Sequence, residues 1–205
     1  GDFIDPINPS LFTDKIEIPY HVFNTISRDA EITELENQNP GSWQLSYQND
    51  LLYGNPNGNA VIRIYDVDIT DKFLEIGMGS YPDYKYWVAA QVPETGYVLI
   101  HSDNENGWIK GIETSITYSE QNGLSVNNGQ RTVITNLDLS PFTIKAYSAH
   151  GMESSTDPPA TTSGIFIIKI ISADYGENPY SIFPFVLTGI IGLTIGILVL
   201  TKKRS

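Results

Sequence analysis

The stretch Ile165-Phe166-Ile167-Ile168-Lys169-Ile170-Ile171 is apolar at six of its seven positions. A short apolar run rich in β-branched residues predicts a strand, since an amphipathic helix needs a longer segment with a 3.6-residue period. Apolar residues fall on both alternating sides of this run. We therefore expect an interior strand that is buried on both faces of its sheet.

Other short apolar runs precede this one at intervals of about 8–14 residues, each bounded by turn-forming residues. We expect strands at residues 15–23, 30–36, 42–47, 60–67, 73–78, 86–92, 96–101, 112–119, 131–137 and 143–149. Pro19 places the first at a sheet edge or a bulge, and Asn127-Asn128-Gly129 predicts a hairpin turn. The pattern predicts an all-β fold, an antiparallel β-sandwich; two small sandwiches divided near residues 54–59 are the alternative.

A longer apolar segment follows at residues 182–200. Its 19 residues include no charged side chain. At about 1.5 Å per residue, a helix of this length covers roughly 28 Å, close to a bilayer core of about 30 Å. We expect one C-terminal transmembrane helix here, ending at residue 201.

Charge at the two ends of this segment predicts its orientation. Lys202, Lys203 and Arg204 follow it directly, whereas Asp174 and Glu177 precede it. The positive-inside rule then places the tail in the cytoplasm and the N-terminal domain outside the cell membrane, with a single pass. We expect a removed signal peptide ahead of the first residue; tail-anchored insertion with a cytoplasmic domain is the alternative.

These features divide the chain into five segments. We expect an extended N-terminal arm at 1–14, an extracytoplasmic β-sandwich at 15–172, a juxtamembrane linker at 173–181, the helix at 182–201 and a cytoplasmic basic tail at 202–205. So short a linker holds the sandwich close to the lipid, which is typical of a subunit of a membrane complex.

One side of the predicted helix carries small residues. Thr188, Gly192 and Gly196 recur every four residues, with Gly189 next to the first. Small residues at this spacing let a second helix approach closely. We expect integral membrane protein subunits as partners at this face, within membrane lipid; the alternative is that glycine is simply common in membrane helices.

The composition excludes several classes of site. The chain has 24 acidic and 12 basic residues, a net charge of −12, and no cysteine. Without the three tail cations, 24 acidic and nine basic residues leave −15 on the exterior part. Such a surface repels phosphate, so we expect no nucleic acid partner. The lack of cysteine excludes disulfides, thiol catalysis and cysteine-ligated metals.

Two groups of residues are candidate metal ligands. Among the three histidines, His21, His101 and His150, we favour His101, because Asp103 two residues later orients or joins a copper or zinc site. The alternative is that all three are ordinary structural or surface histidines.

The second group is Asp66, Asp68 and Asp71, at a predicted strand end. Their oxygen atoms suit calcium, although aspartate is also an ordinary residue of β-turns. We expect no cofactor, with copper at the first group or calcium at the second as the alternative.

No pattern typical of a nucleophilic hydrolase, a zinc peptidase or a phosphate-binding loop occurs, and no two carboxylates stand out as an acid and a base. We therefore predict that the chain is not an enzyme. Four aromatic residues, Tyr81, Tyr84, Tyr86 and Trp87, are grouped along the chain. They either stack on a sugar, pack on a partner or belong to the β core.

The run Gly96-Tyr97-Val98-Leu99-Ile100-His101, the pair Pro141-Phe142 and the loop at 150–163 resemble parts of β-sandwich domains of archaeal cell-surface proteins. A single C-terminal span with a short basic tail is similar to the layout of archaeal cell-envelope proteins, in the style of ammonia-oxidising archaea. Some proteins of that style accompany membrane oxidase complexes. The resemblance implies a partner complex such as ammonia monooxygenase and transfers no functional residue.

Three functions agree with these features. The leading hypothesis is a non-catalytic, membrane-anchored, extracytoplasmic accessory or structural subunit of a larger membrane protein complex. The second is an extracytoplasmic metal-binding or ligand-binding module. The third is a surface-layer or adhesion protein.

Overall fold

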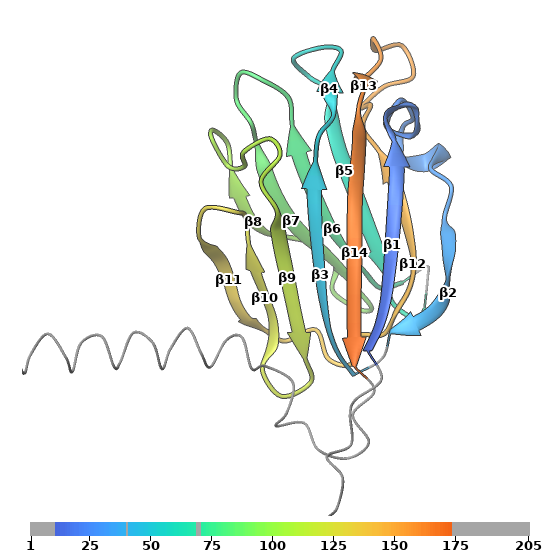
Figure 1. Cartoon of the computed structure of the whole chain (residues 1–205), viewed down its shortest axis with the longest axis vertical. Coiled ribbons are helices and arrows are strands. Elements are labelled where there is room, and N and C mark those ends of the chain that lie inside the picture. The colour runs from blue at the N-terminus through green and yellow to red at the C-terminus, as the bar shows by residue number, and fades with distance from the viewer. Residues whose placement is uncertain (1–10, 40, 69–70, 174–205) are drawn as a thin grey trace, which may run out of the picture. The chain divides into compact units, whose positions relative to one another are not determined.

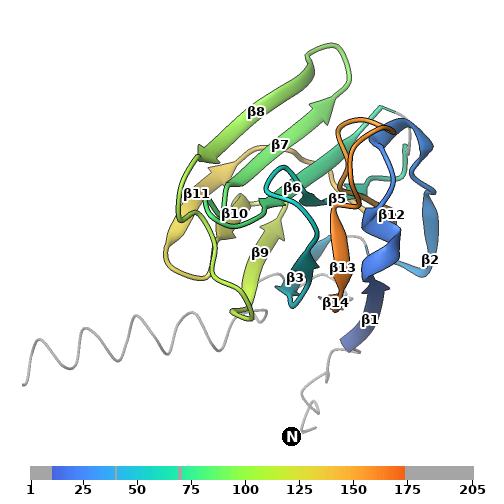
Figure 2. The same cartoon turned by 90° about the horizontal axis from the view of Figure 1, so that it is seen from above.

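Two six-stranded antiparallel sheets pack face to face around one apolar core (Figures 1 and 2). The computed structural model describes residues 11–39, 41–68 and 71–173, and these form one compact unit. Within this range the chain is therefore one sandwich, and the alternative of two sandwiches is wrong.

The strand order of the first sheet is β1-β14-β3-β9-β10-β11. Its strands are β1 (Leu11–Pro19), β14 (Ile165–Ala173), β3 (Ser42–Asn49), β9 (Thr114–Ser119), β10 (Gly123–Asn127) and β11 (Thr132–Leu137). The order of the second is β2-β12-β5-β6-β7-β8. Its strands are β2 (Thr33–Asn39), β12 (Ile144–His150), β5 (Asn59–Tyr65), β6 (Phe73–Gly79), β7 (Tyr86–Val92) and β8 (Gly96–Asp103).

Short elements complete one end of the sandwich. Strands β4 (Leu52–Tyr53) and β13 (Thr161–Ser163) pair with each other. Two single-turn 3-10 helices, η1 (Tyr20–Phe23) and η2 (Ser27–Asp29), connect β1 to β2. Figure 1 shows these elements and the loop between β6 and β7 at the same end.

Alternation along the strands separates core side chains from outer ones. In β6, Leu74, Ile76 and Met78 belong to the core and are at most 2% exposed. Because successive side chains of a strand point to opposite faces, Glu75 and Gly77 lie on the outer face of the second sheet. The main core is thus a single layer between the sheets, and a smaller buried cluster of Tyr65, Phe73 and Ala146 lies on the outer face of the second sheet.

The strand β14 is interior, as predicted, because it pairs with both β1 and β3. The expectation that both of its faces are buried is wrong. Phe166, Ile168 and Ile170 belong to the core, but Lys169 and Ile171 on the other face are exposed. No described element covers the outer face of this sheet, so the side chains there contact solvent.

Most predicted strands are present, with differences at the start and in short elements. Pro19 ends β1, which is an edge strand as predicted, and the predicted turn at Asn127–Gly129 joins β10 to β11. Residues 11–14 belong to β1 and not to an extended arm. Strands β4, β10 and β13 were not predicted, because each has five residues or fewer.

Among the residues that the structure describes, no helix is long and apolar enough to cross a membrane. The segment predicted to do so, at 182–201, lies outside those residues, as do the linker beyond residue 173 and the tail. The membrane span, its orientation and the cell-membrane location stay predictions.

A hydrogen bond between Tyr47 of β3 and Tyr86 of β7 joins the two sheets inside the core. The hydroxyl oxygens lie 2.6 Å apart and both side chains are buried. Tyr86→Phe should lower the free energy of unfolding by about 1 kcal/mol, because it leaves the hydroxyl of Tyr47 without this partner. The double variant with Tyr47→Phe should lose less than the sum of the two single variants, since neither hydroxyl is then left unpaired. Urea unfolding measures the cycle, and additive losses would contradict a direct bond.

Candidate functional site

A concavity of about 530 Å³ lies on the outer face of the second sheet. Its floor consists of side chains from five neighbouring strands: His150 (β12), Arg63 (β5), Glu75 (β6), Trp87 (β7) and Tyr97 (β8). Residues of three loops form its walls: Pro56 and Asn57; Ser80, Pro82 and Asp83; and Gly151 to Glu153. We call this feature the Glu75 concavity.

The register of the strands brings the floor residues together. Arg63 lies opposite Glu75 across β5 and β6, and Trp87 lies opposite Gly77 across β6 and β7. His150 lies opposite Val61 at the other side of β5. Directly opposite residues of antiparallel strands have Cβ atoms about 5 Å apart, so the side chains contact one another.

Glu75 is the centre of a hydrogen-bond network. Its Oε2 accepts a bond from Arg63 Nε at 2.8 Å. Its Oε1 accepts bonds from Tyr97 Oη at 2.7 Å and from Trp87 Nε1 at 3.1 Å. Donors from three strands thus hold one buried carboxylate, and this carboxylate fixes the orientation of two aromatic rings and one guanidinium group.

The network keeps the Glu75 side chain ionised. Burial on its own would raise the pKa of Glu75, but the hydrogen bonds from Tyr97, Trp87 and Arg63 and the charge of Arg63 outweigh burial and lower it. Burial and the bond to Glu75 raise the pKa of the Tyr97 phenol. At neutral pH the carboxylate is therefore charged and the phenol donates its proton.

Trp87 occupies space that is open because residue 77 is a glycine. A Cβ atom on Gly77 would lie 1.9 Å from Cε2 of Trp87 and 2.0 Å from its Cζ2. The indole ring therefore lies against the bare backbone of β6. Trp87 is half-buried, in contrast to Trp43 and Trp108, which are each 2% exposed. It presents an oriented aromatic surface to the concavity.

His150 contributes a polar group without a protein partner. The side chain is 7% exposed, and within the described part of the chain its Nδ1 is the one buried side-chain polar atom with no hydrogen bond. Burial, together with the charge of Arg63, lowers the pKa of His150 to about 4. The ring is neutral at pH 7 and offers one donor and one acceptor. An unpaired buried polar atom costs about 1–3 kcal/mol, so a ligand or a water that bonds to it is favoured.

The charged side chains of the concavity nearly balance one another. Two are basic, Arg63 and Lys85, and three are acidic, Glu75, Asp83 and Glu153. Arg63 is already paired with Glu75, and Lys85 lies 3.8 Å from Asp83. The site therefore offers many hydrogen-bonding groups without a strong field of either sign.

The structure brings His101 and Asp103 together but also gives Asp103 a cationic neighbour. His101 Nε2 lies 3.0 Å from Asp103 Oδ2, and Arg131 Nη2 donates to Asp103 Oδ1 at 3.0 Å. The other two histidines lie elsewhere, His21 on η1 and His150 on β12. The predicted orienting contact exists; copper at this pair stays a prediction.

The aspartates 66, 68 and 71 lie at the turn between β5 and β6. Asp66 Oδ1 accepts bonds from the backbone N–H groups of Val67 and Thr143, both at 2.7 Å, and Oδ2 lies 3.2 Å from Lys72 Nζ. Asp66 thus ties this turn to the start of β12. No group of three or more His, Asp or Glu side chains arranged to hold a metal ion occurs within residues 11–39, 41–68 and 71–173. Calcium at the aspartates stays a prediction.

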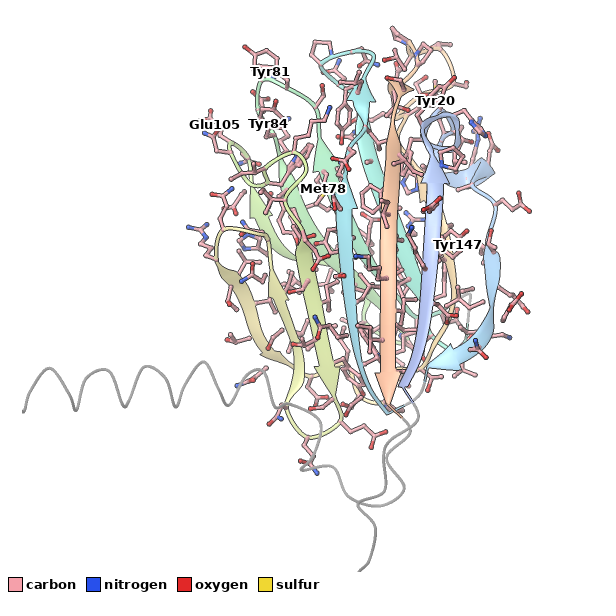
Figure 3. The ribbon with its side chains drawn as sticks, in the orientation of Figure 1. Tyr20, Met78, Tyr81, Tyr84, Glu105 and Tyr147 are labelled. Carbon is pink, nitrogen blue, oxygen red and sulfur yellow. The ribbon has the colours of Figure 1, made fainter. Side chains whose placement is uncertain are left out.

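The aromatic group divides among three environments. Tyr86 is fully buried in the core, Trp87 lies in the Glu75 concavity, and Tyr81 and Tyr84 lie together on the loop between β6 and β7 (Figure 3). Sequence reasoning missed Arg63, Glu75 and Tyr97. The helix-packing residues Thr188, Gly189, Gly192 and Gly196 lie outside the described residues.

No protein-family model and no curated protein matches the sequence. Solved structures with a similar fold include carbohydrate-binding and galectin-like sandwiches. The carbohydrate-binding module CBM66 from Bacillus subtilis is 8% identical, with 70% of this chain and 78% of that chain covered and a TM-score of 0.43. Sheep galectin-11 in complex with glycerol is 9% identical, with coverages of 68% and 96% and a TM-score of 0.40.

The CBM2 module of an evolved Dit protein from Lactobacillus casei BL23 phage J-1 is 9% identical, with coverages of 78% and 99% and a TM-score of 0.47. These similarities concern the general sandwich architecture. At identities and TM-scores this low they carry no argument about what this chain binds.

Gly77→Ala tests the position of the Trp87 ring. The added methyl group overlaps the indole, so we expect a loss of about 1–3 kcal/mol of stability and a red shift of tryptophan emission as the ring moves toward water. When Trp87 has already been replaced by alanine, Gly77→Ala should cost little further stability, because the ring that it overlaps is gone. Equal losses in the presence and absence of Trp87 would contradict the contact.

His150 predicts a dependence of stability on pH. The pKa of His150 is lowered from 6.5 to about 4 in the folded state, so between these pH values the unfolded chain binds more protons than the folded chain. The contribution of the neutral histidine to stability is therefore full above pH 6.5 and falls as the pH falls. Between pH 7 and 5 the loss from this residue amounts to about 2 kcal/mol. His150→Gln should flatten the curve of unfolding free energy in this interval, as measured by urea unfolding. The lowered pKa of Glu75 acts in the more acidic range, below its ordinary value of 4.5. A variant curve as steep as that of the wild type would contradict the buried neutral histidine.

Proposed function

We propose that this chain is a non-catalytic binding module that holds a neutral saccharide in the Glu75 concavity. The observation that carries the proposal is the Trp87 ring, which is half-buried and fixed by Glu75 and Gly77 in a concavity whose two basic side chains are each paired with a carboxylate. This corresponds to the ligand-binding alternative among the sequence hypotheses, without a metal.

The chemistry of the lining suits a ligand with many hydroxyl groups. Each sugar hydroxyl donates and accepts hydrogen bonds, and the concavity offers donors and acceptors of both kinds: the amide groups of Asn57 and Asn59, the terminal nitrogens of Arg63 and the ring of His150. The apolar C–H face of a sugar ring can pack on Trp87. A phosphate ligand would need an excess of cations, which this acidic site lacks.

The arrangement favours binding over reaction. Three donors occupy Glu75, and its lowered pKa makes it a poor general acid. Tyr97 holds its proton tightly. Glu75 and Tyr97 therefore hold other side chains in place and are poorly suited to transfer protons. This supports our prediction that the chain is not an enzyme.

The end of the last strand and the loop that carries Tyr81 lie at opposite ends of the sandwich (Figures 1 and 3). Ala173 at the end of β14 pairs with Ser42 at the start of β3, whereas the wall residue Pro56 follows the other end of β3. We propose that residues 182–200 anchor the module outside the cell. A subunit role in a membrane complex is compatible with this placement and stays a prediction.

Binding of neutral glycans to the full chain tests the proposed function. We expect an array of neutral homo-oligosaccharides to contain ligands, and their binding to change the tryptophan emission, because Trp87 is the one tryptophan of the three that is not buried. Trp87→Ala should weaken binding at least about tenfold, or about 1.4 kcal/mol, while Trp87→Phe, which keeps an aromatic face, should weaken it less. Absence of binding to every neutral glycan, or equal affinity of Trp87→Ala, would contradict the proposal.

A further inference from the structure

A second concavity of about 400 Å³ adjoins the first. The two share Pro56 and Ser80 as lining residues. The second continues over the loop that carries Tyr81 and Tyr84 and over Trp108. We call it the Tyr81 concavity.

A row of three aromatic side chains lines this concavity, and the sandwich supports the row from below. Trp108 is 2% exposed and its Nε1 donates to the carbonyl of Gly79 at 2.9 Å. The ring of Tyr84 packs edge-on against Trp108 with centroids 5.2 Å apart, and Tyr81 packs edge-on against Tyr84 at 5.9 Å. Tyr81, at the end of this row, is 69% exposed, and Figure 3 shows both tyrosines projecting at one end of the sandwich.

The backbone of this loop is held in an uncommon conformation. Tyr84 has a φ of 49°, in the left-handed region that bulky residues rarely adopt. Its N–H donates to Ser80 O at 3.0 Å, and its carbonyl accepts from Gly107 N–H at 2.8 Å. Such conformations persist where surrounding contacts stabilise them, and they occur often at ligand sites. The loop is therefore fixed, and Tyr81 remains exposed although a large aromatic side chain gains free energy from burial.

We propose that the Tyr81 concavity is a second sugar subsite, so that the ligand is a neutral oligosaccharide of several units and not a single sugar. This inference rests on the proposed function. Each concavity is within the range that small ligands fill, and the shared wall at Pro56 and Ser80 allows one chain to continue from Trp87 to Tyr81. The two aromatic surfaces then bind different units of the same chain.

The charge of this region favours a neutral chain over an acidic one. Of the residues that line the Tyr81 concavity, Lys110 is the one with a charged side chain. A single cation does not offset the repulsion of an acidic polymer by a protein of net charge −12. An uncharged oligosaccharide meets no such repulsion.

The dependence of affinity on ligand length tests this inference. The probes are neutral homo-oligosaccharides of one to six units, of the sugar that binds best to the full chain, measured by titration calorimetry. We expect the Kd to fall by at least about tenfold (about 1.4 kcal/mol) between one or two units and four or more. Tyr81→Ala should remove this gain and leave the affinity for the shortest ligand that binds unchanged, and Tyr81→Phe should retain most of the gain.

Controls separate the two proposals. Tyr20→Ala removes another exposed tyrosine, on η1 and outside both concavities, and should change nothing. Affinity that does not depend on length, or a Tyr81→Ala variant that keeps the full gain, would overturn the second subsite while the proposed function stands. Absence of binding at every length would overturn both.

Discussion

The carboxylate of Glu75 is the group on which the outer face of the second sheet depends. A buried carboxylate is stable only with hydrogen-bond donors around it, and here the donors come from Arg63, Trp87 and Tyr97 on three different strands. Glu75 and its three donors therefore stabilise one another. The three side chains keep Glu75 ionised, and Glu75 holds them in one arrangement. The sandwich supplies the fixed strand register that this arrangement requires, because its main core packs against the other side of the sheet.

The sandwich itself follows from patterns that act within one strand. Alternation along Phe73–Gly79 and along Tyr86–Val92 separates an apolar side from a mixed one without reference to any neighbour, so the antiparallel β fold is predictable. Burial of the second face of β14 is not, because it depends on whether another layer covers the sheet. Lys169 was the sign that none does: its ammonium group lies 3.7 Å from Glu113 on the outer face. A charged residue within an apolar strand thus marks the exposed side.

The site depends on pairing between strands, which the sequence states only indirectly. Arg63 and Glu75 are equally distant from position 69, so a tight hairpin centred there places them opposite each other, as the structure does. Without this pairing, Arg63 and Glu75 are each typical of a charged side chain on the surface of a strand. His150 comes from a strand whose neighbours could not be read from chain order, since β12 lies between β2 and β5. Gly77 carried a usable signal, because a glycine inside a strand often marks a close approach of another group, and here that group is the ring of Trp87.

The rigidity of the aromatic side chains in the two concavities affects the free energy of ligand binding. A ligand that binds to side chains already held in place does not lose free energy to ordering them, so weak contacts with a sugar can suffice. Trp87 is held by Glu75 and by the backbone at Gly77, and Tyr81 stands on Tyr84, which in turn packs on the buried Trp108. Both aromatic surfaces are thus fixed to the sandwich and are not mobile loop residues. Because the two sets of contacts share only Pro56 and Ser80, substitutions in one should add to substitutions in the other. Additivity of this kind is what a chain-like ligand with one sugar on each surface requires.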